Sequence, residues 1–469
     1  MTVILLYNKE TSVAVIFCLP VIPALFPGTV HLNRTLTHTI PLSQTPPPPP
    51  TTTRMAAAQP PSPWRDLPAD LLGLVLLRLP SLPDRVRLRA VCCSWRAGAA
   101  RGRHPRLPPP LPWLALRDGG LVDLDGEPIR CATPIPRHGV VGHLAVDNLA
   151  FLIHLDGGCS LLNPLSSSAA SAITPLPWLN LAAVDGAIGQ PGVFIGIGAY
   201  VNVYSKSVLS SPLDSSPDPL VAVVTSCGRH VAVAPCKRRG VVTIVSGLMA
   251  PQIPGLNPTR FSDIAFLGGK LYTLTNAEGL LVLDLGSNGV DDPPNASHRR
   301  CIADDPNQHD YYIDGSSKNK SLVLRYLVDS NGRLLMVRRW MNCRQQFYAG
   351  DMDKTRGFEV FAAEISDGHG QWVKLDSLGD QAIFLSSECS KSVTASQCAD
   401  GIQQDCIYFM HRIYDNPSKE CHGQCVDPLG DSGVYNMRDG TINLLRPRAV
   451  MSELRWKRQY LTWFFPSDE

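Results

Sequence analysis

Short hairpins recur along most of this 469-residue chain, and they limit what it can fold into. Short apolar or alternating runs separated by turn residues make up most of residues 113–469. Asp-Gly and Gly-Gly pairs between such runs are typical of tight β-hairpins. The hairpin pattern is clearest at residues 149–163, 262–285, 322–340, 357–375 and 433–445. This region shows no convincing long helical pattern, so the sequence predicts a mainly β domain.

A long series of hairpins leaves many sheet edges that the fold must cover or pair. Radial repetition into a β-propeller solves this problem within one domain. At about 40–50 residues per blade, residues 113–469 would form roughly six to eight blades. Two packed β-sandwiches are the alternative that the hairpins leave open.

The stretch from residue 64 to residue 96 has a different pattern, with apolar side chains at helical spacing. Pro68 suits a first helical turn, and Asp70 places a negative charge there. The apolar positions are Leu71, Leu72, Val75, Leu76 and Leu79, then Leu88, Val91, Cys92 and Trp95. We predict two short helices, divided near Pro80 and Pro83. Helices this short are marginal alone, so their apolar faces must pack against the rest of the chain or another protein.

These residues resemble the F-box, a small helical motif. The matching pairs and triplets occur in the family's order: Leu67-Pro68, Leu71-Leu72, Arg78-Leu79-Pro80, Val91-Cys92 and Trp95-Arg96. The resemblance implies that the helices bind a Skp-type adaptor and, through it, a cullin. An ordinary helical hairpin in a globular core is the alternative. The residues that we expect to contact the adaptor are Leu67, Pro68, Leu71, Leu72, Val75, Leu79, Val91, Cys92 and Trp95.

The hairpin region resembles a large plant family in which an F-box precedes a KIB-type β-propeller, the domain of unknown function 295 family. The resemblance rests on residues 358–361 (FEVF), 372–375 (WVKL), 377–385 (SLGDQAIFL), 406–409 (CIYF), 433–437 (GVYNM) and 463–466 (WFFP). Weaker matches at 162–165, 263–266 and 326–330 extend it from about residue 110 to the end. The loop at 415–431 departs from the family pattern, being longer and richer in Cys and Gly.

These patterns divide the chain into four parts. We predict a disordered or extension segment at 1–60, an F-box at 62–103, a linker at 104–112 and a KIB-type β-propeller at 113–469. We expect the F-box and the propeller to have separate cores. The proline run at 46–50 favours an extended chain. Met55 resembles an ordinary start of translation, which would remove residues 1–54; a targeting signal in those residues is the alternative.

Composition narrows the class of partner. The net charge of +2 argues against a dedicated nucleic-acid binder. A local basic cluster comprises Arg85, Arg87, Arg89, Arg96, Arg101, Arg103 and Arg106. It suits the solvated rim of a binding surface better than a phosphate-binding stripe. Fourteen scattered cysteines favour reduced thiols and a cytoplasmic or nuclear location. The broken apolar patch at 13–26 is too short to span a bilayer, so we expect no membrane partner.

Residue patterns typical of catalysis are missing from the sequence. It has no Gly-x-Ser-x-Gly elbow, no His-Glu-x-x-His and no phosphate-binding Gly-Lys-Ser/Thr, and residues 196–198 lack the third glycine of a dinucleotide site. His411, Cys421, His422 and Cys425 have the ligand types of a zinc site, but their spacing matches no common one. We therefore expect no cofactor and no catalytic activity in this chain.

The resemblance implies a substrate-recognition subunit of a Skp–cullin–F-box ubiquitin ligase, with the propeller recruiting a target protein for ubiquitination and degradation. A non-ligase β-propeller interaction protein, directed to an organelle by residues 1–54, is the alternative. The sequence does not name the target, because propeller binding faces are made of loops.

Three aromatic residues lie close to the C-terminus, where chains usually fray. Trp463, Phe464 and Phe465 would form a costly apolar patch if they were exposed. We predict that this tail is docked and either closes the propeller ring or seals its last blade against the first. A flexible tail is the alternative.

Overall fold

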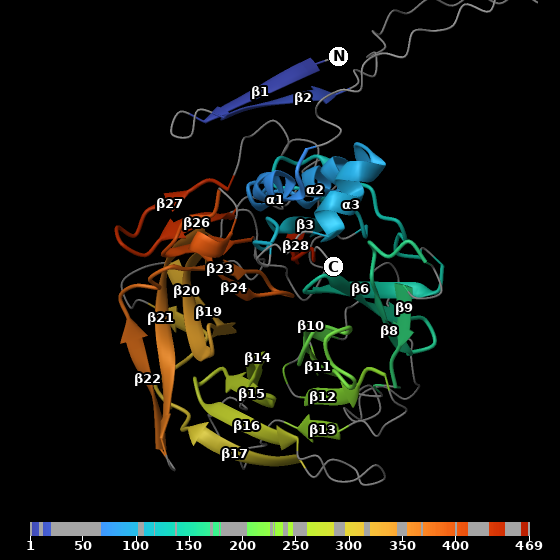
Figure 1. The fold of residues 1–469 in the computed structure, drawn as a ribbon. Helices are drawn as coiled ribbons and strands as arrows, with labels where there is room; N and C mark the ends of the chain where they lie inside the picture. Colours follow the sequence, from blue (N-terminus) through green and yellow to red (C-terminus); the bar gives the residue numbers. More distant parts are fainter. Residues whose placement is uncertain are drawn as a thin grey trace, which may run out of the picture. The chain divides into compact units, whose positions relative to one another are not determined.

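The computed structural model divides the chain into two units, Met1–Pro60 and Pro61–Glu469 (Figure 1). The described residues are 2–8, 13–19, 67–101, 107–116, 118–136, 138–168, 172–177, 179, 204–225, 228, 230–237, 243–246, 260–285, 296–313, 319–344, 354–366, 369–398, 401–410, 431–445 and 461–467. In the first unit, β1 (Thr2–Asn8) pairs antiparallel with β2 (Val13–Leu19). The rest of the predicted tail, including residues 46–50 and Met55, lies outside the described residues.

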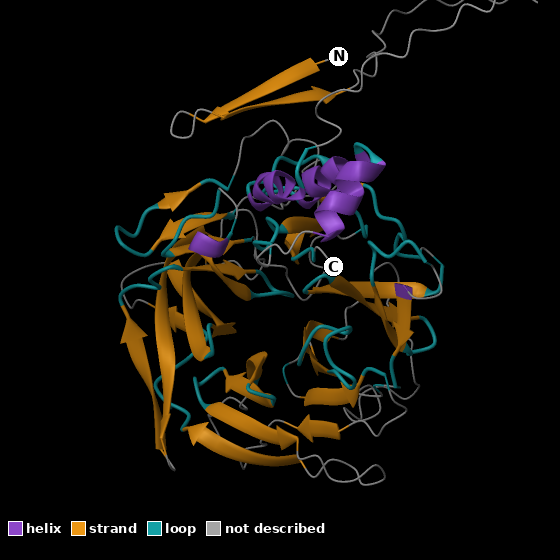
Figure 2. Ribbon diagram, viewed as in Figure 1, coloured by secondary structure: helices purple, strands orange, loops and turns teal. Residues whose placement is uncertain are grey.

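Six sheets in the second unit form the blades of a propeller (Figures 1 and 2). Blade 1 holds β28 (Leu461–Phe464), β3 (Trp113–Leu116), β4 (Leu121–Val122) and β5 (Pro128–Ile129). Blade 2 holds β6 (Val140–Val146), β7 (Leu149–His154), β8 (Cys159–Leu162) and β9 (Ile173–Pro175). Blade 3 holds β10 (Tyr204–Leu209), β11 (Leu220–Thr225), β12 (His230–Pro235) and β13 (Thr243–Ser246).

The other three blades follow in chain order. Blade 4 holds β14 (Phe261–Leu267), β15 (Lys270–Thr275), β16 (Leu280–Leu285) and β17 (Ala296–Ile302). Blade 5 holds β18 (Tyr311–Ile313), β19 (Asn319–Ser330), β20 (Arg333–Arg344), β21 (Lys354–Ser366) and β22 (His369–Leu375). Blade 6 holds β24 (Lys391–Thr394), β23 (Gln381–Leu385), β25 (Cys406–Phe409), β26 (Gly433–Asn436) and β27 (Ile442–Asn443). The mainly β propeller is confirmed with six blades, and the two-sandwich alternative is wrong.

Local turn chemistry explains why the predicted hairpins form. Between β19 and β20, Asn331 and Gly332 have φ angles of 52° and 76°, as a tight two-residue hairpin turn requires. Between β7 and β8, the Asp156 carboxylate accepts the Gly158 N–H at 2.9 Å. Such contacts are local in sequence, so the hairpin positions could be predicted without a structure.

Blade 6 departs from a simple run of hairpins. β23 pairs in parallel with β25, while β24 pairs with the other edge of β23. The chain passes from β24 through a short 3-10 helix, Ala395–Gln397, before it reaches β25. Parallel neighbours need a crossover connection, which leaves no turn motif in the sequence.

The C-terminal strand closes the ring. β28 pairs antiparallel with β3, placing Trp463 opposite Leu114 and Phe464 opposite Trp113. Trp463 is fully buried and its indole N–H donates to the Leu385 carbonyl of β23 at 3.0 Å. The Phe465 N–H donates to the Asp147 carbonyl, just before β7, at 2.8 Å. The prediction of a docked, ring-closing tail is confirmed, and the flexible tail is wrong.

Three short helices precede the propeller: α1 (Ala69–Leu77), α2 (Leu82–Ala90) and α3 (Cys93–Arg101). The prediction of two helices is wrong, because the second run breaks at Val91 and Cys92. Cys92 Sγ accepts the Trp95 N–H at 3.4 Å, a capping contact that begins a new helix. None of the described helices has both the length and the apolar composition needed to cross a membrane.

The helices and the propeller share part of a core. Leu72, Leu76, Leu88 and Trp95 form a buried cluster between the helices. Leu82, however, belongs to the buried cluster of blades 1 and 6. The expectation of separate cores is therefore wrong, because helical periodicity does not show which neighbour an apolar residue meets.

Candidate functional site

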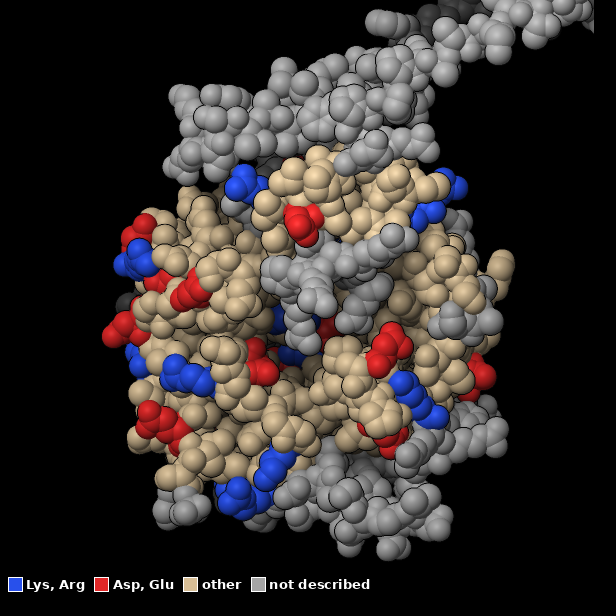
Figure 3. Space-filling view, viewed as in Figure 1, with Lys and Arg blue, Asp and Glu red and all other residues tan. Residues whose placement is uncertain are grey.

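Four large apolar side chains in the helical region are exposed: Leu71 (48%) and Leu74 (57%) on α1, Val86 (54%) on α2, and Val91 (60%) directly after α2. Among the described residues, nine large apolar side chains are exposed, so the helical region carries almost half of them. We use the term apolar helical surface for these four exposed side chains, taken together without a claim that they touch one another. In Figure 3, uncharged side chains cover most of the helical region in view, with acidic atoms over the α1 area and basic side chains at the left and right edges.

The sequence of α1 explains why an apolar face is left over. Leu72 and Leu76 point into the helical core, yet Leu71 and Leu74 are apolar as well. A helix that is apolar on every side is normally buried on every side. Exposed apolar patches on soluble proteins typically mark interaction sites, so the outer face of α1 is a candidate binding surface.

The nine predicted adaptor-contacting residues occupy three kinds of environment. Pro68, Leu71 and Val91 are exposed, Leu67, Val75, Leu79 and Cys92 are half-buried, and Leu72 and Trp95 are buried. The two buried residues hold the helices together, and their predicted contact with an adaptor stays a prediction. Leu74 and Val86 were not predicted, although both are apolar residues beside predicted helical faces.

The arginines of the predicted basic cluster also lie in different environments. Arg85 is fully buried, and its Nε donates to the Leu79 carbonyl at 2.9 Å, so it is not part of a solvated rim. Arg87 is exposed and pairs with Asp84 at 2.6 Å. The side chains of Arg101, Arg103 and Arg106 lie outside the described residues.

The zinc-like residues His411, Cys421, His422 and Cys425, together with residues 196–198 and the loop at 415–430, also lie outside the described residues. Within the described part of the chain, no group of three or more His, Cys, Asp or Glu side chains is arranged to hold a metal ion.

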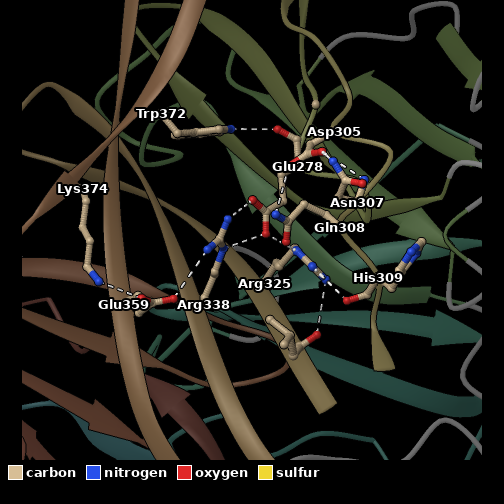
Figure 4. A network of polar contacts seen from close by, with 12 residues as sticks. Glu278, Asp305, Asn307, Gln308, His309, Arg325, Arg338, Glu359, Trp372 and Lys374 are labelled. Carbon is tan, nitrogen blue, oxygen red and sulfur yellow. Dashed lines mark hydrogen bonds and ion pairs between the residues drawn. The ribbon is translucent and has the colours of Figure 1, made fainter. Parts of the chain in front are cut away.

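Apart from the apolar helical surface, a cluster of polar side chains joins blade 4 to blade 5 (Figure 4). Glu278, in the turn between β15 and β16, has a φ of 64° and a nearly buried side chain. Its carboxylate accepts Arg325 Nε at 2.8 Å and Arg338 Nε at 2.7 Å, and a further bond from Arg338. The Trp372 indole N–H donates to the Glu278 carbonyl at 2.7 Å. Four contacts thus hold one turn of blade 4 against three strands of blade 5.

Further charged side chains extend this cluster from the buried Glu278 towards solvent. Arg325 also donates to Asp310 at 3.0 Å. Arg338 faces Glu359, which accepts Lys374 Nζ at 2.7 Å and the Trp340 indole N–H at 3.0 Å. Burial alone would raise the pKa of the Glu359 carboxyl, but hydrogen bonds from Lys374 and Trp340 outweigh it and hold the pKa below its ordinary value. The charged and polar groups of this cluster form hydrogen bonds and ion pairs with one another, so the arrangement is suited to joining blades.

Comparison with protein families identifies a family for most of the propeller. The family described as the KIB1-4 beta-propeller matches residues 122–436, about two thirds of the chain. The chain belongs to the KIB1-4 beta-propeller family. The match runs from β4 in blade 1 to β26 in blade 6 and confirms the predicted KIB-type propeller. The three helices precede it.

Comparisons with curated proteins and with solved structures add little to what the family match shows. No curated protein matches this KIB1-4 propeller chain. Among solved structures, it is similar to a protein from Bacteroides uniformis described as a 6-phosphogluconolactonase, at 12% identity and a TM-score of 0.29. That similarity covers 71% of this chain and 81% of the other, and nothing about function follows from it.

Proposed function

We propose that this KIB1-4 propeller protein is the substrate-recognition subunit of a Skp–cullin–F-box ubiquitin ligase. The observation that carries the proposal is the apolar helical surface, which lies in a helical region whose sequence follows the F-box pattern. Leu71 and Val91 belong both to that pattern and to the exposed surface. A Skp-type adaptor would cover this surface and connect it to a cullin.

The proposed division of labour needs no catalysis by this chain. The propeller would hold a target protein, and the adaptor would bring the ubiquitin-loaded enzyme to it. Holding two reactants together raises their effective concentration, which accelerates transfer without any bond being made or broken by the receptor. Cytoplasmic or nuclear location is part of the proposal, because the cullin machinery must be reached.

Binding to a purified Skp-type adaptor tests the proposal. We expect the native protein to bind, and we expect Leu71→Ala together with Val91→Ala to lose about 2–4 kcal/mol, roughly 30- to 1000-fold in affinity. Both side chains are exposed, so the fold of the variant should be unaffected. Leu444→Ala is the matched control, because Leu444 is 71% exposed on the propeller.

Two results would overturn this proposal. The first is failure of the native protein to bind any Skp-type adaptor. The second is binding that Leu71→Ala with Val91→Ala leaves unchanged. Either result would favour the non-ligase interaction protein.

A further inference from the structure

Among the described helical residues, one buried apolar side chain lies outside the helical core. Leu82, the first residue of α2, is 7% exposed and belongs to the cluster that contains Trp113 and Phe464. Leu88, in the same helix, belongs instead to the helical core with Leu72 and Trp95. The two ends of α2 are thus buried in two different cores.

Backbone contacts reinforce the attachment at this point. The Pro80 carbonyl, two residues before α2, accepts the Leu111 N–H at 3.0 Å. Leu107 packs partly buried against the helical core. The described part of the predicted linker therefore lies against the helices and contributes to their attachment.

The cluster that receives Leu82 is the ring closure itself. Trp113 of β3 and Phe464 of β28 stack with their ring centroids 5.9 Å apart and their planes 7° from parallel. Trp463 and Phe465 belong to the same cluster. In Figures 1 and 2 the helices lie beside β3 and β28, in agreement with this cluster. Leu82 therefore packs into the cluster shared by blades 1 and 6, where the C-terminal strand closes the ring.

We infer that Leu82 is a positioning residue that fixes the helices at the ring closure, in the cluster shared by blades 1 and 6, so that an adaptor bound to the apolar helical surface is held in one orientation to the propeller. The consequence for the adaptor rests on the proposed function, but the fixed orientation does not. Loss of the Leu82 side chain removes apolar contact from the closure cluster and leaves the apolar helical surface intact. The helices should then sample several orientations while still binding the adaptor.

A distance distribution between two exposed sites measures this orientation. Fluorophores carried by unnatural amino acids at Ser94 in α3 and Asp376 on the propeller form a donor and acceptor pair, because both residues are exposed. In single-molecule energy transfer without adaptor, the native protein should give one narrow distribution. Leu82→Ala should broaden it, and Leu82→Met, which nearly restores the volume, should narrow it again.

Leu88→Ala is the matched control, with the same change in the same helix but in the helical core. We expect Leu88→Ala to weaken adaptor binding, whereas Leu82→Ala should leave the affinity unchanged. If Leu82→Ala proves too unstable to purify, Leu82→Val makes a smaller cavity and should broaden the distribution less. A distribution for Leu82→Ala as narrow as the native one would overturn the inference. Failure of the native protein to bind adaptor would overturn only the proposed function.

Discussion

At the scale of single residues, Glu278 combines a strained backbone with a buried charge. It has a left-handed backbone, which costs a non-glycine residue free energy. Its carboxylate is the shared partner of two arginines, of which Arg325 has a side chain only 1% exposed. A buried ion pair contributes modestly to net stability, but removal of one partner is costly because the other charge stays buried.

We therefore predict that Glu278→Ala lowers the free energy of unfolding by about 3–5 kcal/mol. Glu364→Ala is the control. Glu364 lies on β21 of blade 5, is exposed, and its carboxylate accepts only a long hydrogen bond, 3.5 Å, from Gln371 among the described residues. The control should stay within about 0.5 kcal/mol of the native protein. Urea unfolding of the two variants checks this. Equal urea midpoints for Glu278→Ala and Glu364→Ala would mean that the polar cluster around Glu278 does not hold blades 4 and 5 together.

The predicted site residues show what single-residue patterns could and could not predict. The apolar spacing correctly placed α1 around Leu71, but it predicted one helix where the structure has α2 and α3 with Val91 between them. It did not separate exposed Leu71 from Leu72 and Trp95, which fill the helical core. Spacing shows which side chains share a face, but burial depends on the neighbour that covers that face.

At the scale of elements, the hairpins were predictable and the irregular elements were not. Turns such as Asn331-Gly332 specify their strands through contacts between adjacent residues. The parallel pairing of β23 with β25 depends on residues far apart in sequence. The break between α2 and α3 depends on a capping contact from the Cys92 sulfur, and cysteine is not a usual capping residue.

The element-scale prediction concerns β28. Deletion of residues 461–469 removes the strand that pairs with β3 and two fully buried aromatic side chains, Trp463 and Phe464. Loss of one buried Phe or Trp side chain costs about 3–5 kcal/mol, against about 5–15 kcal/mol for a whole domain. We expect the truncated propeller to become insoluble or protease-sensitive. A melting temperature within a degree or two of the full-length value would contradict this view of the closure.

At the scale of the whole molecule, closure makes the six blades interdependent. Asp263 of blade 4 pairs with Lys206 of blade 3 at 2.6 Å and accepts the Leu327 N–H of blade 5 at 2.8 Å. Lys391 of blade 6 pairs with Asp147 of blade 2 at 2.8 Å. The number of blades could not be fixed from sequence, since such contacts link residues that no local pattern connects. These ion pairs and hydrogen bonds between blades predict that the ring unfolds as one unit.

Two buried cysteines on different parts of the ring test this cooperativity. Cys236 belongs to the core shared by blades 2 and 3, and Cys389 belongs to the closure cluster. Burial raises the pKa of both thiols to about 12, so neither forms much thiolate in the folded protein at about pH 8. Each thiol keeps its proton in the folded state, so stability is lost only as the pH rises above the ordinary value of 9.0.

We predict that pulsed alkylation at about pH 8, read by mass spectrometry, modifies exposed Cys93 without urea and leaves Cys236 and Cys389 intact. As urea is raised, Cys236 and Cys389 should become reactive together, because opening any blade breaks the ring that buries both. Cys93 serves as the internal control for reagent activity at every urea concentration. Labelling of Cys389 at clearly lower urea than Cys236 would show that the closure opens on its own, and blades 2 and 3 would then be an independent folding unit.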